Sequence, residues 1–254
     1  MQSSRMQPEM TAACPAPQRI LALDLLRSLA LLGMVIFHFV HDLEMFGYLS
    51  KGTTVTGGWA LFASLIAGSF LFLAGFSMSL AHNPEIRWSA FCRRLAIIAA
   101  AAFAVTIATY VAFLDRFIFF GILHVIAVSS MLGLLFVKAP TAVVLGAAIG
   151  AFLLPDIFRT DALNVTFLTW IGLSTQWRPS LDFLPLFPWL SPFLAGICAQ
   201  RLARRTGLLG KMETYFIPKG NLLQVLAWPG RRSLVIYLIH QPILIVLFWL
   251  WTKL

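Results

Sequence analysis

The sequence predicts an all-α integral membrane protein, a polytopic bundle of about seven transmembrane helices. Two observations lead to this prediction. Hydrophobic residues make up 59% of the 254 residues and charged residues only 11%, with a mean hydropathy of +0.85. A soluble domain of this length could not bury so much apolar surface. The apolar residues are also grouped into runs of about membrane length, separated by more polar stretches.

The apolar runs define the predicted spans. They cover residues 20–41, 58–80, 93–113, 116–137, 140–155, 182–202 and 232–252. Six to eight spans are compatible with this pattern. The fifth run, bounded by Pro140 and Pro155, covers only about 24 Å at 1.5 Å per residue. Residues 162–173 are apolar but short, and we interpret them as re-entrant or interfacial. If they crossed the membrane, the orientation of the C-terminus would reverse.

The distribution of positive charge indicates the orientation. With the N-terminus in the cytoplasm, 13 of the 19 Lys and Arg residues lie on the cytoplasmic side and five on the outer side. Arg27 falls within the first span. This asymmetry is the positive-inside pattern, and it explains the net charge of +9 without a nucleic-acid partner. Seven spans then place the C-terminus outside the cytoplasm.

One domain is predicted, at residues 19–254. No polar stretch between the spans is long enough to form a soluble core. Residues 1–18 contain three prolines and little pattern, so they are predicted to be a disordered cytoplasmic tail. The three cysteines and five histidines show no metal-ligand spacing, and we expect no metal site.

The first span carries ionisable residues at both ends. Asp24 and Arg27 lie near its cytoplasmic end, and His38, His41 and Asp42 lie at its outer end. Ionisable residues in a span are costly and usually face a protein interior or a water-filled cavity. Asp24 and Arg27, three residues apart, can form a local ion pair. The pair is either structural or leaves Arg27 facing a phosphate of a cytosolic donor.

His38 and Asp42 are four residues apart and share a helical face. A carboxylate beside an imidazole fixes its tautomer and stabilises the imidazolium, as a general base requires. The alternative interpretation is a histidine that bridges two helices by hydrogen bonds, with Asp42 solvated at the membrane interface.

Two later spans also contain histidines at membrane depth, His124 and His240. Ser233, Tyr237 and Gln241 are spaced by four residues and therefore line one helical face. His240 lies beside this face. Either the three histidine-bearing spans converge on one polar channel, or the histidines make scattered hydrogen bonds between helices.

The sixth span begins in a proline-rich segment, L-P-L-F-P-W-L-S-P, which includes Trp189. Pro185, Pro188 and Pro192 are predicted to break or kink the helix. Broken backbone at membrane depth is tolerated where it is buried in protein or lines a cavity. This segment therefore favours a cavity that opens on the outer side.

The second span presents a face of small residues, namely Gly68, Ser69, Ala74, Gly75, Ser77 and Ser79. Such a face lets another helix approach closely, and we interpret it as plain helix packing. No internal repeat is found, so an inverted-repeat transporter gains no support.

The stretch 201–232 is rich in basic residues, among them Arg231. Basic side chains of this kind suit anionic lipid headgroups, and equally a donor that bears phosphates. They also occur as determinants of topology alone.

These segments together resemble a known family. Its first helix, which usually contains D-x-x-R-G-x-A, is similar to R-I-L-A-L-D-L-L-R-S-L-A-L-L-G-M-V-I-F-H, where Ser28 stands in place of the glycine. Its later blocks are similar, in order, to F-L-F-L-A-G-F-S-M-S-L, F-C-R-R-L, F-G-I-L-H-V-I-A-V-S-S, L-P-L-F-P-W-L-S-P-F-L-A-G and S-L-V-I-Y-L-I-H-Q-P-I-L. The family comprises the bacterial relatives of the heparan-α-glucosaminide N-acetyltransferase catalytic domain, within the transmembrane acyltransferases. The resemblance covers about residues 19–250.

The resemblance implies a bacterial inner-membrane enzyme that moves an acetyl group from cytosolic acetyl-CoA to an extracytoplasmic acceptor. The acceptor would be a carbohydrate hydroxyl or amine of an envelope glycan, and acetyl-CoA would be a co-substrate, with no cofactor bound permanently. In the lysosomal relative, a histidine after the first helix is held to be catalytic. Here His41 is the nearest loop residue, and His38 is the nearest match at the helix end.

We expect His38 to act as the base, oriented by Asp42, with His41 as the other candidate. The donor phosphates would lie near basic residues of the cytoplasmic side, namely Arg27 with its neighbour Asp24, Arg93, Arg94 and Arg231. The channel and acceptor site would be lined by His124, His240, Tyr237, Gln241, Ser233 and Trp189.

A non-catalytic transporter or flippase for a glycan or another small molecule is the alternative function. It would use the same histidine-lined cavity for proton coupling. A structural membrane subunit is a third reading, in which the histidines serve packing alone. A homodimer is compatible with each of the three.

Overall fold

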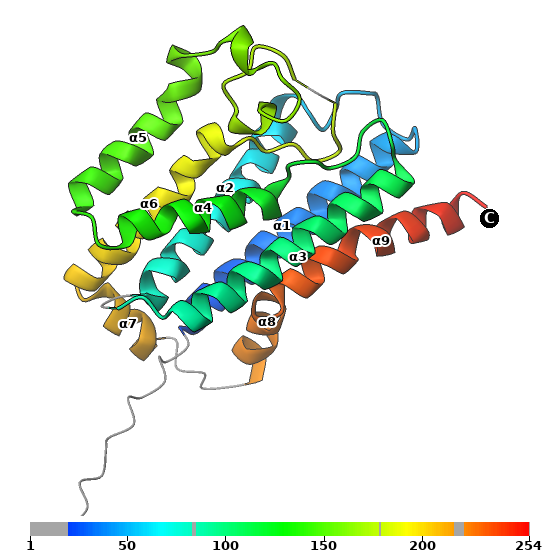
Figure 1. The fold of residues 1–254 in the computed structure, drawn as a ribbon. Helices are drawn as coiled ribbons and strands as arrows, with labels where there is room; N and C mark the ends of the chain where they lie inside the picture. Colours follow the sequence, from blue (N-terminus) through cyan, green and yellow to red (C-terminus); the bar gives the residue numbers. More distant parts are fainter. Residues whose placement is uncertain (1–19, 83–84, 178, 216–220, 254) are drawn as a thin grey trace, which may run out of the picture.

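The computed structural model describes residues 20–82, 85–177, 179–215 and 221–253, and over these residues it is helical, with no β-strand (Figure 1). The prediction of an all-α protein is thus confirmed for the described part of the chain. The predicted N-terminal tail, residues 1–18, lies outside the described residues. The helices are α1 Leu21–Met45, α2 Gly57–Ala81, α3 Trp88–Ala112, α4 Ile122–Val137, α5 Thr141–Ile157, α6 Leu186–Arg205, α7 Leu208–Tyr215, α8 Asn221–Arg231 and α9 Ser233–Trp251.

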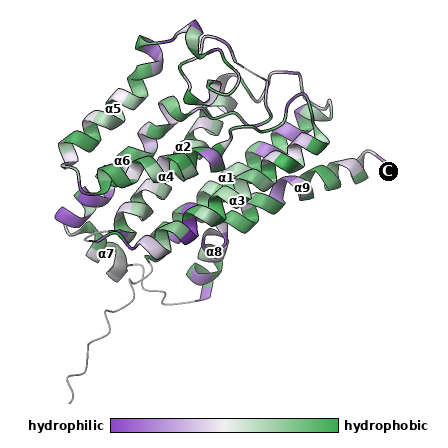
Figure 2. Ribbon diagram, in the orientation of Figure 1, coloured by the Kyte–Doolittle hydropathy of each residue, from purple (hydrophilic) through white to green (hydrophobic). Residues whose placement is uncertain are grey.

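Four of these helices are long and apolar enough to cross a membrane, namely α1, α2, α3 and α9. The helices α4 and α5 are apolar but shorter, with 16 and 17 residues. Hydrophobic residues make up most of the length of the bundle helices (Figure 2), as expected of an integral membrane protein, whose surface faces lipid instead of water. The structure therefore supports a membrane bundle, with fewer clear spans than the seven predicted.

Two helices begin later than the sequence predicts. The predicted fourth span starts at residue 116, but α4 starts at Ile122, because Thr106 and Thr109 of α3 bind the backbone of Ile118 at 2.7 and 3.0 Å and hold this segment out of a helix. The predicted sixth span starts at residue 182, but α6 starts at Leu186, after the N-cap residue Pro185. The backbone at Phe187 is non-helical, which agrees with the predicted break.

Of two other segments, the first agrees with the sequence-based interpretation and the second departs from it. Residues 162–173 form no spanning helix and contain only part of the 3₁₀ turn Asp161–Leu163 and the turn Thr169–Ile171. The basic stretch 201–232 holds the end of α6 and the helices α7 and α8, which periodicity did not reveal. Ser28 of α1 accepts a hydrogen bond of 2.8 Å from the Gly230 amide, so α8 packs against the start of α1.

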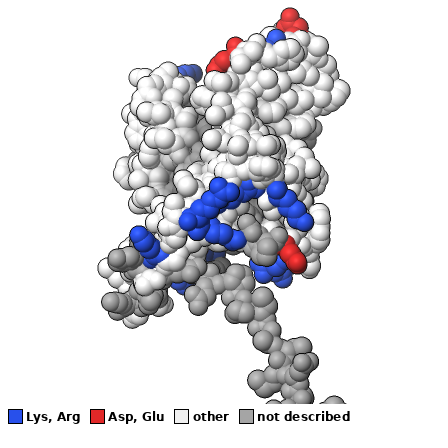
Figure 3. All heavy atoms as spheres, turned by 90° about the vertical axis from the view of Figure 1, so that its left-hand side faces the viewer, with Lys and Arg blue, Asp and Glu red and all other residues white. Residues whose placement is uncertain are grey.

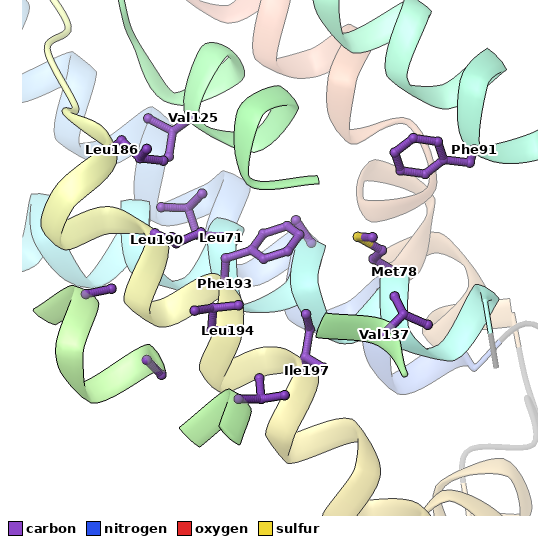
Figure 4. Close-up of a cluster of buried hydrophobic side chains, with 14 of the residues drawn as sticks. Leu71, Met78, Phe91, Val125, Val137, Leu186, Leu190, Phe193, Leu194 and Ile197 are labelled. Carbon is purple, nitrogen blue, oxygen red and sulfur yellow. The ribbon is translucent and has the colours of Figure 1, made fainter. Parts of the chain in front are cut away.

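The tightest helix contact joins α2 to α6. A Cβ atom at Gly75 would lie 1.9 Å from the Phe193 carbonyl oxygen, and one at Gly196 would lie 2.1 Å from that of Phe72. Only glycine permits this approach, so the predicted small-residue face of α2 packs closely at Gly75, whereas Gly68 of the same face has nothing within 4 Å of its Cβ position. Around it lies the main apolar core, shown in Figure 4, which includes the buried side chains of Leu71, Met78, Val125, Phe193, Leu194 and Ile197.

The helices define two ends of the bundle. One end, here called the basic end, holds the start of α1 and the ends of α2 and α6. These helices pack together there through Leu23, Phe76 and Ala203. At the opposite end, here called the loop end, lie segments 46–56, 113–121, 158–177 and 179–185 (Figure 1). The rings of Phe46 and Phe248 stack at 5.4 Å, so α9 runs parallel to α1 and ends at the loop end. Figure 3 shows Lys and Arg side chains gathered in a band across the lower half of one face.

Candidate active site

Helices α1 and α9 bring two histidines into contact. The ring centroids of His38 and His240 lie 4.9 Å apart. His240 Nδ1 lies 2.6 Å from the Tyr237 carbonyl oxygen. Because a carbonyl oxygen only accepts, Nδ1 carries the proton, and Nε2 of the neutral ring keeps a lone pair. His240 Nε2 and His38 Nδ1 are buried and lack a hydrogen-bond partner among the described residues, so both can serve a ligand.

Asp42 is fully buried, so it is not the solvated interfacial residue of the alternative interpretation. Its Oδ1 accepts a hydrogen bond of 2.8 Å from Gln241 Nε2 on α9. His38 and Asp42, both in the described part of the chain, are not hydrogen-bonded to each other, and His38 Nδ1 has no partner there. Asp42 therefore positions Gln241, and the spacing of four residues does not by itself join His38 to Asp42.

His41 has a partner that the sequence did not reveal. Thr54, in the loop after α1, donates its hydroxyl to Glu44 Oε2 at 2.7 Å and lies 3.1 Å from His41 Nδ1. A hydroxyl has one proton, so Thr54 accepts from His41 Nδ1–H. The neutral His41 ring then keeps its lone pair on Nε2. Glu44 also accepts from the Gly52 and Thr54 amides at 2.6 and 2.8 Å, which fixes the loop.

A cavity of about 300 Å³ at the loop end collects these groups. His38, His41, His240 and Gln241 line it together with Asp182, and α3 contributes an apolar wall that includes Val105 and Ala108. Among the residues that the structure describes, no Lys or Arg lines this cavity. The cavity is a small chamber with basic nitrogens, one carboxyl group and an apolar side.

Asp182 is a cavity residue that the sequence did not single out. It lies in the loop before α6, and its Oδ2 accepts a hydrogen bond of 3.1 Å from the Ile122 amide at the start of α4. Burial raises the pKa of its carboxyl to about 6, against the opposing effect of that hydrogen bond. Only its place directly before the proline-rich start of the sixth helix could have pointed to it.

A second cavity of about 500 Å³ begins at the basic end, where Arg27, Arg93 and Arg94 line it. Arg27 pairs with Asp24 at 2.9 Å and donates to the Ser77 hydroxyl at 2.5 Å. The pair predicted from the spacing of three residues is therefore present. Arg93 and Arg94 have no carboxylate within 4.0 Å among the described residues. The cavity thus offers guanidinium groups of the kind that bind phosphate oxygens.

Tyr237 of α9 lines both cavities. Around it, Ala101, Ala102 and Leu123 are buried and Leu238 is partly buried in a small apolar cluster. The arginine cavity and the histidine cavity therefore share Tyr237 as a lining residue. Asp24 and Asp42 mark the two ends of this region on α1, and 18 residues of helix separate them by about 27 Å.

Comparison with known protein families identifies the family to which the chain belongs. The model of the catalytic region of heparan-alpha-glucosaminide N-acetyltransferase matches residues 19–242. The chain belongs to this family. The resemblance inferred from the ordered sequence blocks is confirmed, and the matched region includes both cavities' residues on α1, α3 and the first half of α9. No curated protein and no solved structure matches the chain.

In this member of the heparan-alpha-glucosaminide N-acetyltransferase catalytic family, some expected site residues lie elsewhere. His124 accepts the Gly121 amide at 3.2 Å and lies 3.2 Å from the Thr106 hydroxyl, so it ties α4 to α3 and lines neither cavity. Trp189 packs against the main apolar core. Ser233 lines the arginine cavity, not the histidine cavity.

Arg231 is also placed differently from the expectation. Its Nε lies 3.5 Å from Asp24 Oδ2, and it does not line the arginine cavity. It therefore ties α8 to α1. Among the described residues, no group of three or more His, Cys, Asp or Glu side chains could hold a metal ion.

Proposed function

We propose that this protein transfers an acetyl group from cytosolic acetyl-CoA to a hydroxyl or amine of an envelope glycan or amino sugar on the far side of a bacterial inner membrane. The observation that carries the proposal is the pair of cavities that meet at Tyr237, with arginines on one side and histidines on the other. Membership of an N-acetyltransferase family supports the chemistry. Acetyl-CoA serves as co-substrate, and no permanently bound cofactor takes part.

The proposed topology has seven spans, formed by α1 to α6 and α9. The basic end faces the cytoplasm and the loop end faces outward, because basic residues prefer the cytoplasmic side. The N-terminus is then cytoplasmic and the C-terminus extracytoplasmic. Residues 19–254 form one transmembrane domain, and nothing in the proposal requires more than one copy, although a homodimer is compatible with it.

The proposed donor site is the arginine cavity. Arg93 and Arg94 bind the phosphates of acetyl-CoA, and Arg27, held by Asp24, adds a third guanidinium. The pantetheine arm then runs along the apolar wall formed by residues such as Ile98 and Leu123 and brings the thioester past Tyr237. On this route the thioester passes Tyr237, because that side chain lines both cavities.

The proposed base is His41 or His38, and the hydrogen bonds favour His41. Its Nδ1 is held by Thr54, which Glu44 orients in turn, and a carboxylate in this relay stabilises the imidazolium. His41 Nε2 takes the proton of the acceptor O–H or N–H while the acceptor attacks the thioester carbonyl. The C–S bond breaks, and the CoA sulfur leaves and receives that proton. His38, His240 and Gln241 position the acceptor.

A test requires purified protein in detergent or nanodiscs with [¹⁴C]acetyl-CoA and a panel of amino sugars and glycans. We expect acetyl transfer or slow acetyl-CoA hydrolysis, lost in His41→Ala. Arg93→Gln with Arg94→Gln should raise the KM for acetyl-CoA at least tenfold with a smaller effect on kcat. If the protein showed no turnover with any acceptor of the panel and did not bind acetyl-CoA, the enzyme proposal would be refuted. Histidine-dependent transport of a glycan across the membrane, without acetylation of the glycan, would instead favour the alternative function of a transporter or flippase.

A further inference from the structure

A separate hollow of about 350 Å³ opens at the basic end, between the α4–α5 turn and the last turn of α6. Lys138 and Pro140 line it on one side, and Arg201, Arg204 and Arg205 line it on the other. It shares no lining residue with the arginine cavity. A role for the hollow is therefore independent of the proposed donor site and of acetyl transfer.

Arg201 builds the wall of this hollow. Its guanidinium donates hydrogen bonds to the carbonyl oxygens of Phe136, Val137 and Ala139, at 2.5, 2.9 and 2.6 Å. These are carbonyls at the C-terminal end of α4, which carries the negative end of the helix dipole. Arg201 thus neutralises that end and fixes α6 against the turn, and these three bonds engage most of its five N–H donors within the protein.

Lys138, Arg204 and Arg205 remain for a ligand. All three are exposed, and none has a carboxylate within 4.0 Å among the described residues. In the described part of the chain, no acidic residue lines the hollow. Three cations around one concave site form an anion-binding arrangement, and a phosphate group is the anion that Arg and Lys side chains bind best through charge-assisted hydrogen bonds.

The three helices around the hollow carry exposed apolar side chains close in sequence to its lining, and these favour one kind of phosphate ligand. Leu135 of α4, Leu145 of α5 and Leu202 of α6 are 74%, 50% and 62% exposed, and each lies within five residues of the hollow's lining. A free phosphate would use only the cations. A ligand with a phosphate head and hydrocarbon tails would use the cations and these exposed leucines together.

We propose that this hollow binds the headgroup of an anionic glycerophospholipid, such as phosphatidylglycerol. Lys138, Arg204 and Arg205 hold the phosphate, and the acyl chains lie along Leu135, Leu145 and Leu202. The bound lipid adds a bridge between the α4–α5 turn and the end of α6, which Arg201 already joins by hydrogen bonds.

The test compares Arg204→Gln/Arg205→Gln with a matched control, Lys211→Gln/Arg232→Gln. The control removes the same charge from exposed residues at the same end that do not line the hollow. Each protein is purified in detergent with equal amounts of phosphatidylglycerol and phosphatidylcholine, and bound lipid is measured by native mass spectrometry. We expect wild type and control to retain phosphatidylglycerol selectively, and the Arg204/Arg205 variant to lose about tenfold or more of that retention.

Two further measurements separate the sources of phosphate. Leu202→Gln should weaken retention of phosphatidylglycerol, while glycerol 3-phosphate at millimolar concentration should compete poorly. Efficient competition by glycerol 3-phosphate, with no effect of Leu202→Gln, would show a site for soluble phosphates and overturn the lipid proposal. Equal loss of lipid in both double variants would also overturn it, because general surface charge would then explain the binding.

Discussion

Gln241 of α9 donates a hydrogen bond of 2.8 Å to Asp42 of α1, although 199 residues separate them in sequence. Asp42 is fully buried, and its second oxygen has no partner among the described residues. This bond therefore supplies the partner that a buried carboxyl requires. It also places Gln241 and the adjacent His240 against the wall of the histidine cavity, so the architecture of the site depends on it.

Replacing Gln241 with Leu should destabilise the protein. The change leaves Asp42 buried without a hydrogen bond at Oδ1, which typically costs about 1–3 kcal/mol. Gln241→Glu places a second carboxyl beside the first and should also be destabilising near neutral pH. Thermal unfolding in detergent measures both. If Gln241→Leu unfolds at the wild-type temperature, the bond does not hold α9 against α1.

The role of Thr54 gives a second prediction. Thr54→Val keeps the side-chain shape but removes the acceptor for His41 Nδ1–H and the donor to Glu44 Oε2. We expect kcat for acetyl transfer to fall about tenfold or more, while His41→Ala should cost about 100-fold or more, the range of general base catalysis. Steady-state kinetics with [¹⁴C]acetyl-CoA measure both changes.

Thr54→Ser is the matched control, because it keeps the hydroxyl and should retain most of the activity. If Thr54→Val is as active as Thr54→Ser, the relay from Glu44 to His41 plays no part. If His38→Ala lowers kcat far more than His41→Ala does, the base is His38 instead.

Much of the fold could be predicted from composition because a lipid-facing helix must be apolar along a membrane length. The site could be predicted only in part. Local spacing correctly paired Asp24 with Arg27, since residues three apart on a helix are neighbours. The same logic did not identify the partner of Asp42. Its hydrogen bond comes from another helix, and no short-range rule encodes which side chains of two helices meet.

Two further features had no local signal. Thr54 reaches His41 only because the loop folds back and Glu44 binds two of its amides. The approach of α8 to α1 depends on Gly230, where a Cβ atom would lie 1.9 Å from the Asp24 carbonyl oxygen. From the sequence alone, a glycine in a basic stretch is interpreted as a turn residue. Only the structure shows that Gly230 is needed for the close contact with the backbone of α1.

The contact between α2 and α6 gives a third prediction. Gly75→Ala would place Cβ 1.9 Å from a backbone oxygen of Phe193, and backbone cannot give way as a flexible side chain does. We expect poor folding or a strongly lowered unfolding temperature. Gly146→Ala on α5 is the control, because nothing lies within 4 Å of its Cβ and alanine favours a helix. Fluorescence-detected size exclusion measures both variants, and equal behaviour would refute the tight contact.

Asp182 gives the last prediction, a dependence of stability on pH. Its carboxyl has a pKa of about 6 in the folded protein, against about 3.9 in an unfolded chain. Between these values the unfolded state has lost a proton that the folded state retains. The contribution of Asp182 to the free energy of unfolding therefore falls as pH rises from about 4 to about 6, and is constant above.

Asp182→Asn, which keeps an acceptor for the Ile122 amide, should remove this component. Thermal unfolding of both proteins from pH 4 to pH 8 measures it: the stability of wild type relative to Asp182→Asn should decline toward pH 6 and then level off. A difference that is flat across pH 4 to 6 would mean that the carboxyl is already ionised in the folded protein at pH 4.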